Sequence, residues 1–279
     1  MKPDLALHAG LPKTGTTALQ SRLAASRAAL LGAGWLYPQT ETANAHHFLA
    51  LSLDFANRGP RLMVSRYGRD NGPAVFDRMW TRMLAEIEAC RPAGVILSTE
   101  YVSSRIGLPG GDMLCERLRE TFGNIHVTLY LRQPSTWLTS MLQQTVKYSG
   151  LLTQPRPISW RKDIELWESR FPGCVAVRKY ERNGLRSGDI AEDFLFHALG
   201  REDIPLAPAV QVNETMSAEA ALLMQDFQIR HQPDKDDIPT SEKRRFRERL
   251  READRQVTPQ APPKLRADIW MRDRPTFCG

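Results

Sequence analysis

Short runs of apolar residues alternate along this chain with longer segments in which apolar residues recur every three or four positions. The short runs are typical of buried strands, and the periodic segments are typical of helices that bury one face. The pattern predicts strands at residues 5–9, 35–37, 94–99, 125–131 and 175–177, and helices at residues 16–31, 43–56, 73–90, 111–122, 134–148, 159–170, 188–199, 217–230 and 241–255. Strands that alternate with helices predict βαβ units, and therefore an α/β fold with a parallel sheet.

The length and composition suit one globular domain. The chain has 279 residues, of which 42% are hydrophobic and 25% are charged. We expect residues from about 1 to 200 to form an α/β core that carries the site, and residues from about 205 to 279 to form a mostly helical extension packed on it. Residues 57–73 carry many Gly and Arg residues and predict a loop that would suit a lid. Residues 205–215 and 259–263 predict linkers.

The net charge of +6 favours anionic ligands such as phosphates, sulfates and acidic sugars, although it also serves solubility alone. The 4 cysteines form no CxxC pair, which excludes the usual zinc-site spacing and predicts reduced thiols. No signal peptide or membrane-spanning apolar run is present, so we expect a cytoplasmic protein, or one at most peripheral to a membrane. No motif for binding nucleic acid accompanies the charge, and no metal is expected.

The first predicted strand turns into the first predicted helix through a glycine loop. Backbone N–H groups and the helix dipole make such a junction an anion site. Gly10 and Gly15 match the glycine frame of the nucleotide P-loop, GxxxxGK[ST]. The pattern then departs, because Thr16 stands where the P-loop lysine belongs and the lysine, Lys13, lies inside the loop. That placement suits a lysine beside a 5′-phosphate and the bond to its leaving group. The alternative is a tight turn that binds nothing.

The segment from Pro12 to Thr17 resembles the 5′-phosphosulfate loop of the sulfotransferases that use 3′-phosphoadenosine-5′-phosphosulfate (PAPS). A second segment, the strand that ends at Arg132 with Ser140 eight residues further on, is similar to the 3′-phosphate motif of that family. An arginine can fork onto a phosphate, and a serine can add a hydroxyl donor. The alternatives are a surface ion pair for Arg132 and a helix residue without a ligand for Ser140.

The resemblance implies a three-layer, P-loop-like fold and transfer of the sulfuryl group of PAPS to a hydroxyl. By analogy with the bacterial glycan-type members of the family, that hydroxyl is expected to belong to a carbohydrate. The desulfated product is 3′-phosphoadenosine-5′-phosphate (PAP). Lys13 would neutralise the leaving oxygen, and the cofactor would be held by Gly10, Pro12, Lys13, Thr14, Gly15, Thr16, Thr17, Arg132 and Ser140. The acceptor is expected to be a small molecule or a glycan.

The general base is the least determined part of the site, because the chain lacks the Lys-x-x-His segment of the cytosolic members. Glu100, at the end of the third predicted strand, is the first candidate, since strand ends in α/β sheets point at the ligand crevice. Its alternative roles are a helix cap or an ion pair. His46 and His47, early in a predicted helix, are the second candidates, and the alternative is one core and one exposed histidine.

Two other functions remain open. One is an ATP-dependent small-molecule kinase, which would need Mg²⁺ and would ignore a 3′-phosphate. The other is a non-catalytic nucleotide-binding protein that keeps the pocket without a base. The predicted helix 241–255 is rich in arginine and is interpreted either as a solvated charged face or as a contact for an acidic glycan or the 3′-phosphate. The sequence leaves the acceptor and the oligomeric state undetermined.

Overall fold

The computed structural model describes residues 1–41, 44–148, 159–209, 217–232 and 240–257. The chain divides into two compact units. The first comprises Met1–Arg132 and Ile158–Val212, and the second comprises Gln133–Pro157 and Asn213–Gly279. The second unit therefore includes a predicted helix from the middle of the sequence as well as the C-terminal part. Whether the C-terminal helices pack on the α/β part stays a prediction.

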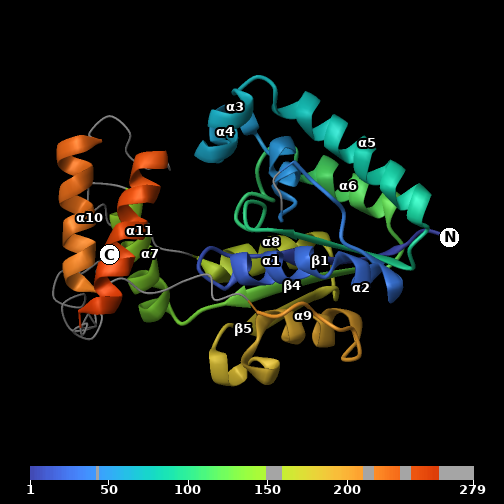
Figure 1. Ribbon diagram of the computed structural model, residues 1–279. Coiled ribbons are helices and arrows are strands. Elements are labelled where there is room, and N and C mark those ends of the chain that lie inside the picture. The colour runs from blue at the N-terminus through green and yellow to red at the C-terminus, as the bar shows by residue number, and fades with distance from the viewer. Residues whose placement is uncertain (42–43, 149–158, 210–216, 233–239, 258–279) are drawn as a thin grey trace, which may run out of the picture. The chain divides into compact units, whose positions relative to one another are not determined.

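The first unit is built on a parallel sheet of five strands in the order β2-β3-β1-β4-β5 (Figure 1). The strands are β1 (Asp4–Ala9), β2 (Trp35–Leu36), β3 (Gly94–Thr99), β4 (Ile125–Leu131) and β5 (Val175–Lys179). Each neighbouring pair runs parallel. The central strands are nearly continuous runs of buried residues, because helices cover both faces of the sheet. The predicted α/β fold, with a central parallel sheet flanked by helices, is confirmed.

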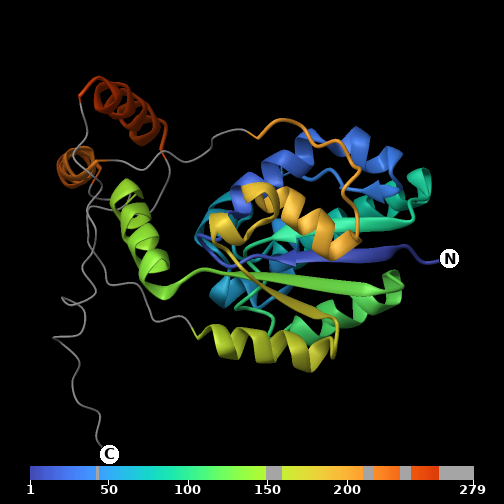
Figure 2. The same ribbon diagram turned by 90° about the horizontal axis from the view of Figure 1, so that it is seen from below.

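Two hydrophobic layers flank the sheet (Figure 2). On one face, apolar side chains of β1, β3 and β4 pack on residues of α5 (Gly72–Cys90), α6 (Gly111–Thr121) and α8 (Trp160–Arg170). On the other face, the sheet packs on α1 (Thr16–Ala25), α2 (Arg27–Gly32) and α9 (Ile190–Leu199). Alternate residues of β1 serve the two layers, since Leu5 and Leu7 face the first and Ala6 faces the second.

Three predicted elements of the first unit need correction. The helix predicted for residues 16–31 is two helices separated at Ser26. Residues 43–56 contain a 3₁₀-helix, η1 (His47–Ser52), and a short helix, α3 (Phe55–Arg58), in place of one α-helix. The loop predicted for residues 57–73 contains α4 (Arg61–Tyr67), which buries Met63. After β5 the chain forms two further 3₁₀ turns, η2 (Arg182–Gly184) and η3 (Arg186–Gly188).

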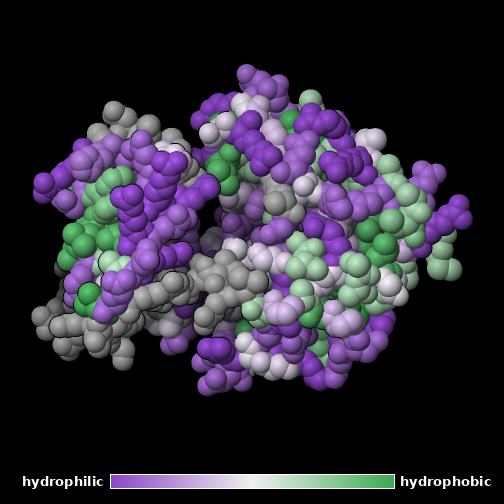
Figure 3. Space-filling view, viewed as in Figure 1, coloured by the Kyte–Doolittle hydropathy of each residue, from purple (hydrophilic) through white to green (hydrophobic). Residues whose placement is uncertain are grey.

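The described part of the second unit consists of α7 (Pro134–Tyr148), α10 (Ala218–His231) and α11 (Ser241–Gln256). Its α10 packs against both other helices. Met224 lies at the centre of a small core, in which the rings of Phe227 and Phe246 are stacked with their centroids 4.2 Å apart. Figure 3 shows hydrophobic residues on the surface over α10. This helix exposes Leu222, Leu223 and Ile229.

The remaining sequence expectations concern cysteines, linkers and membrane segments. Cys90, Cys115 and Cys174 are free thiols, and Cys278 lies outside the described residues. Residues 205–209 belong to no helix or strand, whereas residues 210–215 and 259–263 lie outside the described part. None of the helices in the described ranges has the length and apolar character needed to cross a membrane.

Candidate functional site

The candidate site lies where β1, β3 and β4 end, because these three strands are neighbours in the parallel sheet. Ala9, the last residue of β1, pairs with Thr99, the last residue of β3, and Gly10 N donates to the carbonyl of Thr99 over 2.8 Å. The loop that follows β1 therefore begins beside Glu100. Arg132 follows β4 directly, on the other side of β1.

The loop between β1 and α1 contains two residues with positive φ. Lys13 and Gly15 both adopt the left-handed conformation, with φ of 68° and 78°, and Gly15 is the N-cap of α1. Two predicted hydroxyl donors are used inside the loop, since Thr14 Oγ1 donates to the Leu11 carbonyl over 2.6 Å and Thr16 Oγ1 donates to the same carbonyl over 3.4 Å. Thr17, at the first turn of α1, is exposed. The backbone N–H groups, the Thr17 hydroxyl and the Lys13 ammonium are thus the donors of the loop that could bind an anion.

Tyr180, which follows β5, packs against the loop and was not among the predicted site residues. A Cβ added to Gly15 would lie 2.5 Å from Cε2 of Tyr180, so only glycine fits there. Arg132 extends along the same ring, with its guanidinium carbon 5.8 Å from the ring centroid, and its Nη1 donates to the Lys13 carbonyl over 3.1 Å. In the sequence, Tyr180 stands three residues after the fifth predicted strand, and no motif described above includes it.

Lys13, Glu100 and Arg132 form one electrostatic group. Burial lowers the pKa of the Lys13 ammonium, Glu100 opposes this shift and Arg132 adds to it. Burial raises the pKa of the Glu100 carboxyl, and Lys13 opposes that shift. Two cations and one carboxylate therefore interact at the end of the sheet.

The two candidate histidines differ in what their ring nitrogens do. His46 is fully buried, its Nδ1 accepts from Ser98 N over 3.0 Å, and its Nε2 lies 3.1 Å from the Pro38 carbonyl. Both ring nitrogens are thus engaged by backbone, and burial lowers the pKa of His46 to about 3. His46 is a core histidine, and we drop it as a base. His47 is half-buried, and its Nδ1 lies 3.1 Å from Thr99 Oγ1, beside Glu100.

His8, on β1, packs against the start of the loop at Gly10 and is held by a hydrogen bond to β3. Its Nδ1 lies 2.8 Å from Ser98 Oγ on the adjacent strand, and Gln20 of α1 donates to the same hydroxyl over 3.3 Å. A Cβ added to Gly10 would lie 2.7 Å from the His8 ring, which explains a glycine at the start of the loop. Burial lowers the pKa of His8 to about 3, so the ring is neutral at physiological pH.

Ser140, the last predicted cofactor ligand, lies on α7 in the second unit. Its pairing with Arg132 stays a prediction.

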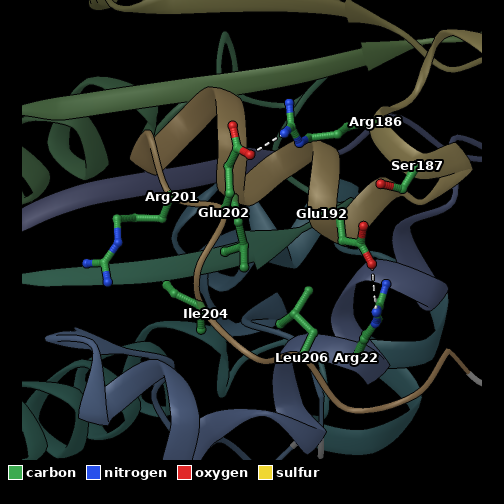
Figure 4. A pocket seen from close by; sticks show the side chains of 9 residues that line it. Arg22, Arg186, Ser187, Glu192, Arg201, Glu202, Ile204 and Leu206 are labelled. Atoms are coloured by element: carbon green, nitrogen blue, oxygen red, sulfur yellow. Dashed lines mark hydrogen bonds and ion pairs between the residues drawn. The ribbon is translucent and has the colours of Figure 1, made fainter.

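A separate cavity of about 380 Å³ lies between α1, α9 and the segment that follows α9 (Figure 4). Its arginines already have carboxylate partners: Arg22 pairs with Glu192, and Arg186 pairs with Glu202. Arg201 holds Asp203 with two hydrogen bonds of 2.7 Å. Because these charges are balanced within the protein, we assign no ligand to this cavity.

Comparison with known proteins gives limited help. No protein family model and no curated protein matches the chain. The chain is weakly similar to the solved structure of a sulfotransferase domain from the curacin biosynthetic pathway, with 13% identity and a TM-score of 0.37 over 90% of this chain and 98% of that one. It is also similar to a sulfotransferase from Alicyclobacillus acidocaldarius, with 14% identity and a TM-score of 0.46 over 88% of this chain and 99% of that one. Likeness of this degree assigns no function, so the residues of the site must carry any proposal.

Proposed function

We propose that this chain is a sulfotransferase that uses PAPS as donor and a carbohydrate hydroxyl as acceptor. The observation that carries the proposal is the position of Lys13. It lies inside the loop, in the left-handed conformation, with Glu100 on one side and Arg132 on the other. In an ATP-binding P-loop the lysine would occupy the position of Thr16, at the start of the helix.

The residues present fit a bisphosphorylated nucleotide. The loop offers the N-terminus of α1, and the cations Lys13 and Arg132 lie at the same end of the sheet. Both positive charges would attract a dianionic phosphate. Ser140 and Thr17 would add hydroxyl donors, as the resemblance implies.

Each residue has a separate task in the proposed reaction. PAPS supplies the sulfuryl group, so that the acceptor oxygen bonds to sulfur while the bond from sulfur to the bridging phosphate oxygen breaks and leaves its electron pair on that oxygen. Lys13 stabilises the charge that develops on the leaving oxygen. Arg132 holds the 3′-phosphate. Tyr180 contacts both Arg132 and the loop at Gly15, and so positions the Arg132 side chain relative to the loop.

Glu100 removes the proton from the attacking hydroxyl in this proposal. Its raised pKa makes it a stronger base than an exposed glutamate, and it follows β3 directly at the edge where the loop begins. His47 is the alternative base. Burial lowers the pKa of His47 to about 4, which makes it a weaker base than an ordinary histidine, so Glu100 is preferred.

The test is release of PAP from PAPS, with glycan acceptors and with water as the slow acceptor. We expect Glu100→Gln to lower the rate by about 10²–10⁴-fold, the usual contribution of a general base, with PAP binding retained. The control is Glu116→Gln, an exposed glutamate of α6, which should leave the rate unchanged. Full activity in Glu100→Gln, together with loss of activity in His47→Gln, would move the base to His47. No PAP release from the native chain above the uncatalysed rate would overturn the proposal.

A further inference from the structure

Arg105 lies next to the proposed base in a turn that is firmly held. The turn follows Glu100, buries Val102 and Ile106 completely, and accepts a hydrogen bond of 3.1 Å from Trp167 Nε1 at the Ser103 carbonyl. Trp167 itself is fully buried. These contacts hold the backbone of the turn, and therefore the backbone of Arg105, in place.

The Arg105 side chain is connected to the base through Tyr101. Its guanidinium carbon lies 6.0 Å from the centroid of the Tyr101 ring, and that ring packs against His47 with centroids 4.4 Å apart. Burial raises the pKa of Tyr101 to about 12, with a smaller contribution from the negative charge of Glu100. Glu100, Tyr101 and Arg105 thus follow one another in space from the end of β3.

Arg105 is half-buried and has no counter-ion among the residues that the structure describes. Its Nη1 donates to the Tyr101 carbonyl over 3.3 Å and its Nε donates to the Arg58 carbonyl over 3.4 Å, both longer than usual. No carboxylate among the described residues pairs with it. Burial lowers the pKa of Arg105. Arg117 also lies over an aromatic ring, but its guanidinium pairs with the Asp77 carboxylate over 2.8 Å.

Two further arginines lie at or contact α3. Arg69 Nη1 donates to the Ala56 carbonyl over 2.9 Å, and Arg58 Nε lies 3.8 Å from Asp54 Oδ2. Arg69 and Arg105 thus both donate to backbone carbonyls of α3. In Figure 3 hydrophilic residues cover much of the surface over α3 and α4. A charged group that is partly withdrawn from water is stabilised by a nearby opposite charge, which an anionic ligand would supply.

We propose that Arg105 determines acceptor specificity by binding a carboxylate or sulfate group of the acceptor, while the reactive hydroxyl of the same molecule faces Glu100. This inference rests on the proposed function, and it narrows the acceptor from a carbohydrate to an anionic one. The planar fork of Arg105 suits either anion, since both present two oxygens in one plane.

The first test reads Arg105 directly by NMR. The ¹H–¹⁵N signals of arginine Nε groups are recorded in the PAP-saturated protein, and the Arg105 signal is assigned as the one lost in Arg105→Lys. Sulfate, a methyl glycoside of a uronic acid and the neutral parent glycoside are titrated at constant ionic strength. We expect the Arg105 signal to shift and saturate with the two anions and to stay still with the neutral glycoside, while the Arg117 signal does not move. An Arg105 signal that moves no more than that of Arg117 would overturn the proposal.

The second test separates recognition from structural support. In Arg105→Gln we expect the KM for a uronic-acid acceptor to rise about tenfold or more, the scale for one charge-assisted hydrogen bond, with kcat within about twofold. The KM for a neutral acceptor should not change, Arg105→Lys should recover part of the loss, and Arg117→Gln should match the native protein. An equal loss with charged and neutral acceptors would assign Arg105 a structural role only. Failure of PAP to bind would refute the proposed function separately, since the Arg105 signal can also be read without PAP.

Discussion

At the scale of single residues, Lys13 and Glu100 act on each other's proton affinity. Each is withdrawn from water, which disfavours the charged form of both, and each partly restores the charged form of the other. The pair therefore sets the pH range in which a charged lysine and a charged carboxylate coexist. That range is narrower than for the free side chains, because the carboxyl pKa is raised and the ammonium pKa is lowered.

This coupling predicts the pH dependence of kcat/KM. Activity needs an ionised Glu100, so the acid limb should lie above the ordinary glutamate pKa of 4.5. It also needs a protonated Lys13, so the alkaline limb should lie below the ordinary lysine pKa of 10.5. Residual activity in Lys13→Ala should lose the alkaline limb, and its acid limb should move to higher pH, because Lys13 no longer lowers the pKa of Glu100. An acid limb that stays in place would show that the two groups are not coupled.

Gly15 offers a second test at this scale. Gly15→Ala places a Cβ at a φ of 78°, which costs about 1–2 kcal/mol, and forces it against the Tyr180 ring. Gly173→Ala is the matched control, since φ there is 69° but nothing lies within 4 Å of the added Cβ. In denaturant titrations we expect Gly15→Ala to lower the free energy of unfolding more than Gly173→Ala does. When Tyr180→Ala is added to Gly15→Ala, we expect it to recover only the difference between the losses of the two glycine variants. Equal losses in the two glycine variants would contradict the described contact.

The sequence contained clear signals for some site residues and none for others. Gly15 and Lys13 belong to a local motif, and Glu100 and Arg132 stand at strand ends, so each could be predicted from its neighbours in the chain. The contact of Tyr180 with Gly15 joins residues far apart in sequence and depends on β5 lying beside β4. That no carboxylate of the described residues pairs with Arg105 likewise depends on the fold.

At the scale of elements, the errors of prediction have tertiary causes. The hydroxyl of Ser26 donates to the Arg22 carbonyl and accepts from Ala207 N, both over 2.8 Å, and this contact with a distant segment lies at the break between α1 and α2. His46 N donates to Ser98 of β3 over 2.8 Å, which draws the following residues toward the sheet and out of an α-helix. Periodicity reports which residues are apolar, and it contains no information about such cross-chain hydrogen bonds.

Asp193 joins three elements, β4, β5 and α9. Its buried carboxylate accepts from the Tyr130 hydroxyl over 2.7 Å and from Arg178 Nη2 over 2.7 Å. Burial acts to raise the pKa of Asp193, but these hydrogen bonds and one from Arg186 N outweigh it, so the pKa is lowered. The ionised carboxylate therefore stabilises the fold at neutral pH, and this contribution is lost as the pH falls through the lowered pKa.

We expect Asp193→Asn to lower the free energy of unfolding by about 3–5 kcal/mol, the scale for breaking a buried ion pair. Asp203→Asn is the control, because Asp203 pairs with Arg201 at the surface and should change the free energy little. Urea unfolding at pH 7 measures both. A small effect at Asp193 would mean that the buried network contributes little to holding β5 and α9 together.

At the scale of the whole molecule, buried neutral histidines predict acid sensitivity. His8 and His46 each have a pKa of about 3 in the folded chain against 6.5 in the unfolded chain. Their contribution to the free energy of unfolding is complete above pH 6.5 and is lost as the pH falls toward 3, because the histidines of the unfolded chain take up protons at a higher pH than those of the folded chain. Between pH 7 and 5 we expect a loss on the order of 1–2 kcal/mol per histidine. His46→Gln should reduce that slope in urea unfolding, and an unchanged slope would contradict the assignment.

The order of the strands assembles the site from distant parts of the chain. With β1 between β3 and β4, the loop of residues 10–15, Glu100 and Arg132 meet at one edge, as expected at the point where strand order reverses. The alternation of strands and helices in the sequence allowed a parallel sheet to be predicted. The order of the strands, which brings these groups together, came from the structure.

The most direct test of the central claim is calorimetric titration with PAP, with 5′-AMP and ATP·Mg²⁺ as comparison ligands. We expect PAP to bind far more tightly than AMP, and Arg132→Ala to lose about 2 kcal/mol or more of PAP affinity, the scale for removing one partner of a charge-assisted pair. Arg161→Ala, a variant of an exposed arginine on α8, should bind PAP like the native chain. Tighter binding of ATP·Mg²⁺, or equal binding of PAP and AMP, would contradict the sulfotransferase account and favour a kinase.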